Sequence, residues 1–344
     1  MEGAVLDKPN VGPSLLQEVV DAVVRYLNIS PTRIISFENT NKYSSSEVCN
    51  RKNSQRIFRN LCDINALGVS DSNLGRSNGG TGASFREALD QMILRLANII
   101  HNKNVLYLEL GPEPVKTSLI LEGIKSKARS ISYLGIDVNE VSKEIMTLEL
   151  SRTIDSSKIH YLVADYRNVC RKKIKDVIGH DAENYVMLVT SLGSQEGNEH
   201  PQVMHEVYRR ITHEADYVVT ELQILPKFDH YPIFEFTHHP LWRDVSKAFL
   251  DSVVGETPSH YGTILVPVNL GSYGTVLCAV TFERLFSKWN NEVDIFLSNY
   301  CLKYTIEQLI HIRKRCGFSV VTQLVTGNES VVFQLLSPDL SEKV

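Results

Sequence analysis

The chain has 344 residues, of which 43% are apolar and 22% charged, and its formal net charge is −4. This composition supplies a full hydrophobic core, and the negative charge argues against a nucleic-acid partner, which usually meets a basic face. No window approaches the roughly eighteen unbroken apolar residues of a membrane span. The first residues, Met1–Gly3, lack the basic and then apolar pattern of a secretory signal.

Cysteine usage bears on the compartment of the protein. The chain has no Cys-x-x-Cys pair, and its cysteines are scattered at positions 49, 62, 170, 278, 301 and 316. Such spacing is typical of reduced thiols rather than of a disulfide framework or a zinc site. The sequence therefore predicts a cytoplasmic protein, and its charge and hydropathy predict no nucleic-acid or membrane partner.

Three helices are expected in the first hundred residues. Apolar residues recur at helical spacing from 14 to 28, where Ser14 can cap the helix, and again from Phe85 to Ile100. A short helix is expected from Gln55 to Leu61 or beyond. Residues 70–84 are rich in glycine and serine, which predicts a mobile loop, and a disordered surface loop is favoured over a lid.

The central feature of the sequence is a β-α-β unit. An apolar strand at 105–110 stops at Gly111, an amphipathic helix follows at 115–127, and a second strand at 131–136 ends at Asp137. Ligands of open parallel sheets bind at the carboxyl ends of the strands, so we expect a nucleoside site there. The alternative is an ordinary α/β turn in an enzyme that binds its ligand elsewhere.

The turn after the first strand decides which nucleoside fits. A dinucleotide site needs Gly-x-Gly-x-x-Gly, whose backbone amides hold a pyrophosphate. Here residues 111–114 read Gly-Pro-Glu-Pro, so two prolines remove amide donors and Glu113 brings negative charge. S-adenosylmethionine (SAM) fits better because it carries no phosphate, and Asp137 is placed to accept hydrogen bonds from its ribose hydroxyls.

The alternation of strands and helices continues beyond this unit. Further elements are expected as a helix at 140–150, a strand at 160–163, a helix at 168–178, a strand at 185–190, a helix at 201–213 and a strand at 215–222. This pattern predicts an α/β fold with a doubly wound parallel sheet.

The regular pattern breaks where five prolines punctuate a segment rich in aromatic residues and histidine, between about 224 and 272. We therefore expect an N-terminal helical region at 1–100, a SAM-binding core at 101–225 and an inserted substrate cap at 226–273. Residues 274–344 are expected to complete the core sheet, with a helix at 305–315 and strands at 318–325 and 331–336.

Two further strand ends carry candidate site residues. Asp165 and Tyr166 follow the third strand, where a carboxylate can accept the adenine amino hydrogens and an aromatic ring can stack. Lys116 can pair with the methionyl carboxylate, or it can be a solvated helix lysine. The loop 191–198 follows the fourth strand and should meet the acceptor, where Asn198 can orient an amine. The sequence does not single out a general base.

Histidines in the cap invite a metal hypothesis. His230, His238 and His239 lie near Trp242, but their spacing matches no usual ligand pair and no acidic residue completes a site. We therefore predict no metal, and interpret these residues as aromatic pocket lining or as cap packing. No cysteine lies in a recognisable catalytic motif.

Six motifs occur in the order seen in one enzyme family: Leu108-Glu109-Leu110-Gly111, Lys116-Thr117, Asp137-Val138, Ala164-Asp165-Tyr166, Leu192-Gly193-Ser194-Gln195-Glu196-Gly197-Asn198 and Thr220-Glu221-Leu222. Over residues 105–225 and 274–336 the chain resembles the histidine-specific, SAM-dependent N-methyltransferases. That family includes the ergothioneine-pathway enzyme that trimethylates the histidine α-amine, and fungal dimethylallyltryptophan N-methyltransferases of secondary metabolism. The Gly-Ser-x-x-Gly-Asn piece is the most specific part.

The resemblance implies a Rossmann-like class I SAM-dependent methyltransferase sheet with an N-terminal helical region and an inserted cap. It also implies that Asn198 holds the amino or carboxyl end of the substrate, which makes it the expected catalytic residue. The expected cofactor contacts are Glu109, Gly111, Lys116, Asp137, Asp165, Tyr166, Ser191 and Gly193. The expected substrate contacts are Asn198, Glu221, Phe236, His239, Trp242, Asn299 and Cys301.

Two departures from the family pattern bear on the substrate. Pro-Glu-Pro at 112–114 stands where the family keeps small residues and a second glycine. The Glu-Val-Ser with which the family recognises imidazole corresponds to Asn299-Tyr300-Cys301. Because the missing carboxylate is the natural partner of a histidine ring, the fold and cofactor are expected to be kept, but histidine is not predicted as the substrate.

Three functions remain open at this point. The leading hypothesis is a methyltransferase that acts on the amine of a small amino acid or amino-acid-derived metabolite and releases S-adenosylhomocysteine. The second keeps the cofactor and changes the acceptor to a hydroxyl, a carbon or a protein side chain. The third is a catalytically inactive SAM-binding regulatory module.

Overall fold

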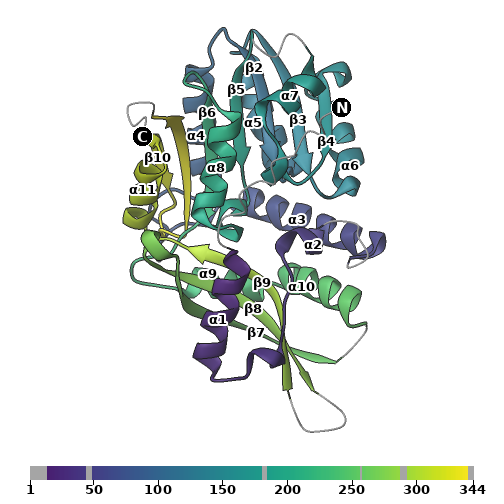
Figure 1. Cartoon of the computed structure of the whole chain (residues 1–344). Helices are drawn as coiled ribbons and strands as arrows, with labels where there is room; N and C mark the ends of the chain where they lie inside the picture. The colour runs from purple at the N-terminus through teal and green to yellow at the C-terminus, as the bar shows by residue number, and fades with distance from the viewer. Residues whose placement is uncertain (1–13, 44–48, 180–183, 256–257, 287–292, 340–344) are drawn as a thin grey trace, which may run out of the picture.

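The computed structural model describes residues 14–43, 49–179, 184–255, 258–286 and 293–339, and within these ranges the strands form two sheets (Figure 1). We call the larger one the core sheet and the smaller one the second sheet. Within the same ranges, no helix is both long and apolar enough to cross a membrane.

The core sheet has the strand order β10-β11-β6-β5-β2-β3-β4. Strands β4, β3, β2, β5 and β6 run parallel, whereas β11 is antiparallel to both of its neighbours, β6 and β10. This is the strand order of the Rossmann-like class I SAM-dependent methyltransferase fold, so the predicted fold class is confirmed. The strands are β2 (Asn104–Leu110), β3 (Ser130–Asp137), β4 (Ile159–Val163), β5 (Val186–Ser191), β6 (Tyr217–Gln223), β10 (Phe318–Val325) and β11 (Val331–Pro338).

Helices cover both faces of the core sheet. Apolar side chains of α4, α5 and α6 form one hydrophobic cluster with the sheet, and those of α7, α8 and α11 belong to another. The chain leaves β2 toward β3 and β4 and then returns to the other side of β2 with β5, so the strand order reverses there, which is where such sheets bind ligands. These helices are α4 (Phe85–Ile99), α5 (Pro114–Lys125), α6 (Glu140–Leu150), α7 (Arg171–Ile178), α8 (Pro201–Ile211) and α11 (Ile306–Arg315).

The second sheet has the order β1-β9-β8-β7, and β1 from the N-terminal region pairs with β9 in parallel. Helix α1 packs on β7 from one side, while α9 and α10 lie on the other (Figure 1). The elements are α1 (Leu15–Leu27), β1 (Ile34–Ile35), α9 (Tyr231–His238), α10 (Pro240–Val253), β7 (Ser259–Asn269), β8 (Thr275–Phe286) and β9 (Val293–Lys303).

This second sheet corrects the expectation that residues 274–344 complete the core sheet. Only β10 and β11 do so, because β8 pairs with β7 and β9 along its length. A tight turn at Gly271–Tyr273 joins β7 to β8, and a hairpin of this kind keeps both strands in one sheet. The expectation failed because an apolar strand pattern shows that a segment is extended but not which sheet it joins.

Helices α2 (Asn39–Tyr43) and α3 (Arg51–Ser70) lie between the core sheet and the second sheet (Figure 1). Helix α3 is longer than the short helix expected from Gln55, and it packs on α10 of one layer and on α5 and α6 of the other. Asn50 caps α3, since its side chain accepts the amide hydrogen of Asn53. The N-terminal region therefore joins the two layers.

The glycine-rich segment at 70–84 was expected to be a disordered surface loop, and the structure shows it tied down. The amide of Gly327 donates to the Ala83 carbonyl at 2.8 Å, and the amide of Asn328 donates to the Gly75 carbonyl at 2.8 Å. A Cβ atom on Gly82 would lie 2.5 Å from the Cα of Gly327, so the two backbones touch. The loop is thereby fixed to the turn between β10 and β11.

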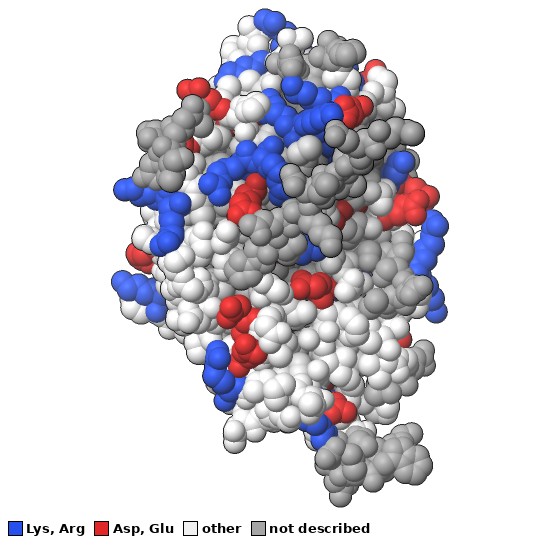
Figure 2. Space-filling view, viewed as in Figure 1, with Lys and Arg blue, Asp and Glu red and all other residues white. Residues whose placement is uncertain are grey.

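Charge is unevenly spread over the face seen in Figure 2. Most of the Lys and Arg side chains visible there lie over the core-sheet half of the molecule, whereas the half over the second sheet shows scattered Asp and Glu side chains and few Lys or Arg. The basic helix α7, with Arg171, Lys172, Lys173 and Lys175, belongs to the core-sheet half. The net charge of −4 therefore conceals a local basic region.

The contact between α4 and α5 yields a stability prediction. A Cβ atom on Gly123 in α5 would lie 2.2 Å from Cγ2 of Ile93 in α4. Alanine normally improves a helix, but here overpacking should lower the free energy of unfolding by about 1–3 kcal/mol, as measured by urea denaturation of Gly123→Ala. The second substitution Ile93→Leu removes Cγ2 at constant volume and should recover most of the loss. A Gly123→Ala variant as stable as the parent would contradict this packing.

Candidate functional site

The two residues on which the cofactor hypothesis depends lie side by side. The amide of Gly111 donates to the carbonyl of Ile136 at 3.0 Å, and Ile136 directly precedes Asp137. Gly111 has a φ of +64°, a conformation that glycine adopts without strain. The carboxyl ends of β2 and β3 thus meet as the sequence predicts.

Asp137 is a partly buried carboxylate at the end of β3. Its Oδ1 accepts the amide hydrogen of Asn139 at 3.1 Å, and its Oδ2 accepts the hydroxyl of Ser142 at 3.0 Å. Burial raises the pKa of Asp137 to about 6. A carboxylate oxygen can accept more than one hydrogen bond, so each oxygen retains capacity for a ribose hydroxyl.

The N-terminus of α5 is already occupied by the protein itself. The carboxylate of Glu113 accepts the amide hydrogens of Val115 at 2.9 Å and of Lys116 at 2.8 Å, and Pro114 has no amide hydrogen to offer. These are the amides that would hold a phosphate in a dinucleotide site. Glu113 therefore excludes a phosphate from this helix end.

Lys116 and Glu221 form a buried ion pair, with 2.6 Å between Nζ and Oε2. Burial opposes the lysine charge, but Glu221 and Glu113 hold the pKa of Lys116 above its ordinary value. A Cβ on Gly193 would lie 3.8 Å from the same Nζ. The structure thus brings together three predicted site residues, and it pairs Lys116 with Glu221 rather than leaving it unpaired.

The end of β4 is linked to the end of β2 by a residue that the sequence analysis missed. Gln195 donates through Nε2 to the Tyr166 hydroxyl at 3.0 Å, and its side chain would lie 3.1 Å from a Cβ on Gly111. Tyr166 in turn donates to Glu199 at 3.1 Å, and burial raises the pKa of Glu199 to about 7. Asp165 binds the guanidinium of its neighbour Arg167, with 2.8 Å between Oδ2 and Nη2.

Glu109 lies away from this edge of the sheet, although it was expected to contact the cofactor. Its carboxylate is fully buried and accepts the hydroxyls of Thr117 at 2.6 Å and of Tyr133 at 2.9 Å. Burial raises the pKa of Glu109 to about 8. Glu109 therefore forms a polar contact within the helix-covered core, one residue short of the strand end.

The loop after β5 is anchored by a buried ion pair. Arg313 of α11 has no exposed side-chain surface, and its Nη2 lies 2.8 Å from Oε2 of Glu196 while Nη1 contacts Oε1. The same guanidinium donates to Thr220 at 3.2 Å and to Gln334 at 3.1 Å. Burial alone would raise the pKa of Glu196, but the charge of Arg313 holds it below the ordinary value.

This loop packs directly on the second sheet. A Cβ on Gly197 would lie 2.6 Å from Sγ of Cys301 in β9, so only glycine fits there. The carbonyl of Asn198 accepts Nδ2 of Asn39 from α2 at 3.4 Å. The structure thus brings the predicted residues Asn198 and Cys301 to one interface between the two sheets.

The remaining predicted substrate residues lie on α9, α10 and β9. The rings of Phe236 and Trp242 are in tilted contact, with centroids 4.8 Å apart and an interplanar angle of 44°, and His239 caps α10 by accepting the amide hydrogen of Leu241 at 3.3 Å. Asn299 accepts a hydrogen bond from Lys42 at 2.7 Å. Among the described residues, no hydrogen-bond partner is found for the buried indole nitrogen of Trp242.

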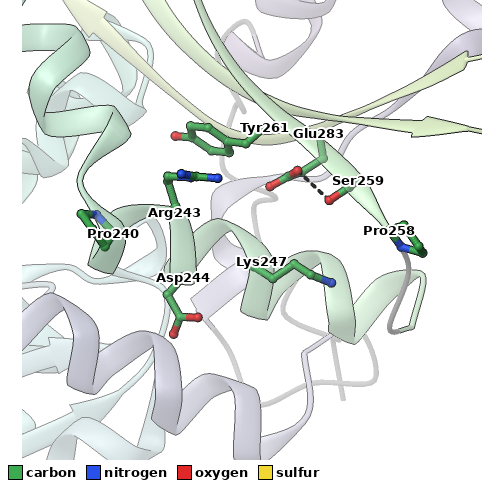
Figure 3. Close-up of a pocket in the computed structure, with 8 residues that line it drawn as sticks. All are labelled: Pro240, Arg243, Asp244, Lys247, Pro258, Ser259, Tyr261 and Glu283. Carbon is green, nitrogen blue, oxygen red and sulfur yellow. Dashed lines mark hydrogen bonds between the residues drawn. The ribbon is translucent and has the colours of Figure 1, made fainter.

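A cavity of about 510 Å³ lies between α10 and the strands β7 and β8, and its lining residues are drawn in Figure 3. Arg243 reaches from α10 to within 5.5 Å of the ring centroid of Tyr261, and Ser259 donates to Glu283 at 2.8 Å. The cavity contains none of the predicted cofactor residues. Its lining is Pro240, Arg243, Asp244, Lys247, Pro258, Ser259, Tyr261 and Glu283.

Cysteine and metal-ligating residues add no further centre to the site. All six cysteines are free thiols, as the sequence predicts. Across the described ranges, no group of three His, Cys, Asp or Glu side chains gathers in a way that could hold a metal ion.

The residues at the carboxyl ends of the core strands fit SAM. Acidic side chains stand at the ends of β3, β4 and β6, glycines of positive φ stand at positions 111 and 193, and the helix end is closed to phosphate. The buried side chain of Ser191 at the end of β5 lies against the hydroxyl of Tyr208. Asp137, Tyr166 and Ser191 thus stand at the carboxyl edge of the core sheet.

Comparison with known proteins agrees with this chemistry. Residues 86–224 match the sequence model of the family described as histidine-specific methyltransferase, SAM-dependent. The chain is a SAM-dependent methyltransferase. The match spans the chain from α4 to the end of β6, and it leaves all of the second sheet and the strands β10 and β11 outside it. No curated protein sequence matches the chain.

Solved structures of methyltransferases are similar to it at low identity. The CcbJ methyltransferase of Streptomyces caelestis is 9% identical with a TM-score of 0.38, over 73% of this chain and 89% of that one. A SAM-dependent methyltransferase of Methanosarcina mazei is 12% identical with a TM-score of 0.37, over 72% and 98%. The 1,6-didemethyltoxoflavin-N1-methyltransferase of Burkholderia thailandensis, solved with S-adenosylhomocysteine, is 8% identical with a TM-score of 0.37, over 73% and 78%. The fold assignment rests on the strand order of this chain rather than on these matches.

The raised pKa of Glu109 predicts a pH-dependent stability. Between its ordinary pKa of 4.5 and its folded value of about 8, the folded protein holds a proton that the unfolded chain releases. Glu109 therefore lowers the free energy of unfolding as pH rises through this window, by at most about 1.4 kcal/mol per pH unit. Glu109→Gln should remove that slope in urea titrations from pH 5 to 8, whereas the control Glu149→Gln on the surface should keep it. Equal slopes for parent and Glu109→Gln would show that Glu109 is ionised in the folded methyltransferase.

The buried pair at the acceptor loop gives a second prediction. Glu196→Gln leaves the Arg313 charge without a carboxylate and should lower the free energy of unfolding by roughly 3–5 kcal/mol. The matched control is Asp90→Asn, which removes the exposed partner of Arg86 and should cost less than about 1 kcal/mol. Denaturation of the parent and the two variants at pH 7 measures both losses of unfolding free energy. Comparable losses in the two variants would contradict this interpretation.

Proposed function

We propose that this methyltransferase transfers the methyl group of SAM to the amine of a small amino acid or an amino-acid-derived metabolite other than histidine. The use of SAM in this proposal is supported by the contact between Gly111 and Ile136, which lies beside Asp137. It is also supported by the neighbouring helix end, which Glu113 closes to phosphate. The acceptor half is supported by the loop that holds Asn198 against the second sheet.

Methyl transfer from SAM depends mainly on how the acceptor nitrogen is positioned. SAM supplies an activated methyl group and a built-in leaving group, so holding the acceptor nitrogen in line contributes most, and such positioning can be worth roughly 7–11 kcal/mol. Asn198 orients the amine through its side-chain oxygen in this proposal. Glu221, which is paired with Lys116 near the end of β6, lies like the Asn198 loop at the carboxyl edge of the core sheet.

Histidine is disfavoured as the substrate by a residue of the second sheet. Asn299 stands where the resembled family has an acid, and it accepts a hydrogen bond from Lys42 rather than offering a carboxylate to an imidazole. An ammonium beside this position repels a protonated imidazole. We also propose a cytosolic location, which is supported by the six free cysteines.

A SAM-binding module without turnover is the second candidate. It is favoured by the Lys116–Glu221 pair, which occupies the lysine expected to bind the methionyl carboxylate, and by Gln195 beside Gly111. Calorimetric titration with SAM followed by incubation with labelled SAM and a panel of amino acids and amines separates the two. Heat of binding without labelled product from any amine would favour the module.

Substitutions at the proposed site give a third prediction. Asp137→Asn removes a charged acceptor of hydrogen bonds, so the dissociation constant for SAM should rise roughly 10- to 100-fold. Asn198→Ala should lower kcat while SAM binding stays within about twofold, because Asn198 is assigned to the acceptor. The control is Asp90→Asn on the surface of α4, which should change neither quantity. Unchanged SAM affinity in Asp137→Asn would refute the placement of the ribose.

A further inference from the structure

A buried lysine lies between the two sheets, and the sequence analysis did not single it out. Lys42 of α2 is 1% exposed, and its Nζ donates to Oδ1 of Asn299 at 2.7 Å and to the carbonyl of Ser298 at 3.1 Å. The same Nζ lies 4.9 Å from the ring centroid of Tyr43. An ammonium has three hydrogens, and these contacts to β9 use two of them.

Lys42 stands at one end of a row of polar side chains on the inner face of the second sheet. Thr263, Thr281 and Asn299 are paired in register across β7, β8 and β9. Thr281 is hydrogen-bonded to Ser298 at 3.0 Å, and Thr263 donates to Thr237 of α9 at 3.2 Å. A row of this kind is unusual in a buried face, since buried polar groups need partners.

Helix α10 covers this face and carries a polar group that lacks a partner. The indole nitrogen of Trp242 is buried without a hydrogen bond to any described residue. Ser246, one turn further along α10, lies against the hydroxyl of Tyr261 in β7. Phe249 on the same helix face packs on Phe296 of β9 with centroids 5.4 Å apart, which places that helix face over the sheet. The indole donor therefore points to a polar ligand between α10 and the second sheet.

The electrostatic surroundings of Lys42 contain no carboxylate partner among the described residues. The titratable groups that act on it are Cys301 of β9 and Cys49, which precedes α3, and Tyr43 lies next to it in α2. Burial lowers the pKa of Lys42 to about 7, and the pKa values of Tyr43 and Cys49 are raised by their own burial. At neutral pH an anionic ligand group would restore the full charge of Lys42.

Helix α2 connects Lys42 to the acceptor loop. Asn39, three residues earlier on α2, donates to the carbonyl of Asn198. Residues three apart lie on one face of a helix. Lys42 and the loop that carries Asn198 therefore lie on the same side of α2.

We propose that Lys42 is the specificity-determining residue of the acceptor site and that it selects acceptors with a carboxylate at the end remote from the methylated amine. This inference rests on the proposed function, since it assumes that Asn198 holds the amine. It narrows the acceptor to an amino acid or derived metabolite with an acidic end, and it excludes acceptors whose remote end is basic or wholly apolar. Lys42 binds the substrate in this account and transfers no proton.

The test compares acceptors that differ only in charge. Labelled SAM is incubated with glutamate against glutamine and with aspartate against asparagine, using the parent, Lys42→Gln, Lys42→Arg and the exposed control Lys52→Gln. The acidic member of the preferred pair should be favoured at least tenfold in kcat/KM by the parent, by Lys42→Arg and by the control, and not by Lys42→Gln. A preference that survives in Lys42→Gln, or equal rates for the members of both pairs, would overturn the inference.

The pH dependence gives a readout that a purely structural lysine would not move. Above pH 7 Lys42 loses its charge in the free protein, so KM for the acidic acceptor should rise by up to about tenfold per pH unit while kcat stays level. Lys42→Gln should show a flat KM. A level KM together with a kcat that falls below pH 7 in the parent would make Lys42 a general base and overturn the proposal.

A measurement on the parent protein covers the case in which the variants do not fold. Binding of glutamate in the presence of S-adenosylhomocysteine should take up a proton at pH 7.5 to 8, seen as a dependence of the calorimetric heat on the ionisation enthalpy of the buffer. Glutamine should show no such uptake, and uptake that is equal for both ligands would contradict the assignment. If neither SAM nor S-adenosylhomocysteine gives heat of binding, the proposed function itself fails. If the cofactor binds but acidic and neutral acceptors are methylated equally, only the inference about Lys42 fails.

Discussion

The buried ion pair between Glu196 and Arg313 fixes the loop after β5 to the core of this methyltransferase. The arginine comes from α11, and its guanidinium also reaches Thr220 in β6 and Gln334 in β11, so one charged group joins the loop after β5 to two strands and a helix. A buried charge is costly unless every hydrogen has a partner, and here the partners come from segments far apart in the chain. The loop with Asn198 therefore has one position relative to the core sheet.

The charged groups at the carboxyl edge of the core sheet, where we place the cofactor, are also paired with one another. Glu113 satisfies the amides of its own helix, and Lys116 is neutralised by Glu221, so the edge of the sheet presents carboxylates and hydroxyls rather than free cations or amides. Such a surface suits an adenosyl group with a positive sulfonium and an ammonium. It offers nothing to a chain of phosphates.

Much of the core was predictable because its elements are strongly periodic. The strand predicted at 105–110 is β2, Asn104–Leu110, and the helix predicted at 140–150 is α6, Glu140–Leu150. The second sheet was not recovered, since its strands lie in a proline-rich segment and in a region that resembles core strands. Pattern alone does not reveal which strands pair.

The site was predictable only in part, for related reasons. Gly111 and Asp137 meet because parallel strands end at one edge, which the sequence implies. Glu109 is hydrogen-bonded to Thr117 within the helix-covered core, a contact that the strand pattern does not reveal. Gln195 and Lys42 were missed because a turn and a five-residue helix carry no periodic signal, and only the folded chain shows what they touch.

The parallel pairing of β1 with β9 has a consequence for how the molecule assembles. Arg33 and Asp294, which flank that pairing, are 261 positions apart and form an ion pair at 2.6 Å. During synthesis the five parallel strands of the core sheet, from β2 to β6, leave the ribosome before β9, and contacts of such long range close slowly. In the nascent chain β1 therefore has no partner strand until all the parallel strands have been made, and β10 and β11 complete the core sheet only after β9.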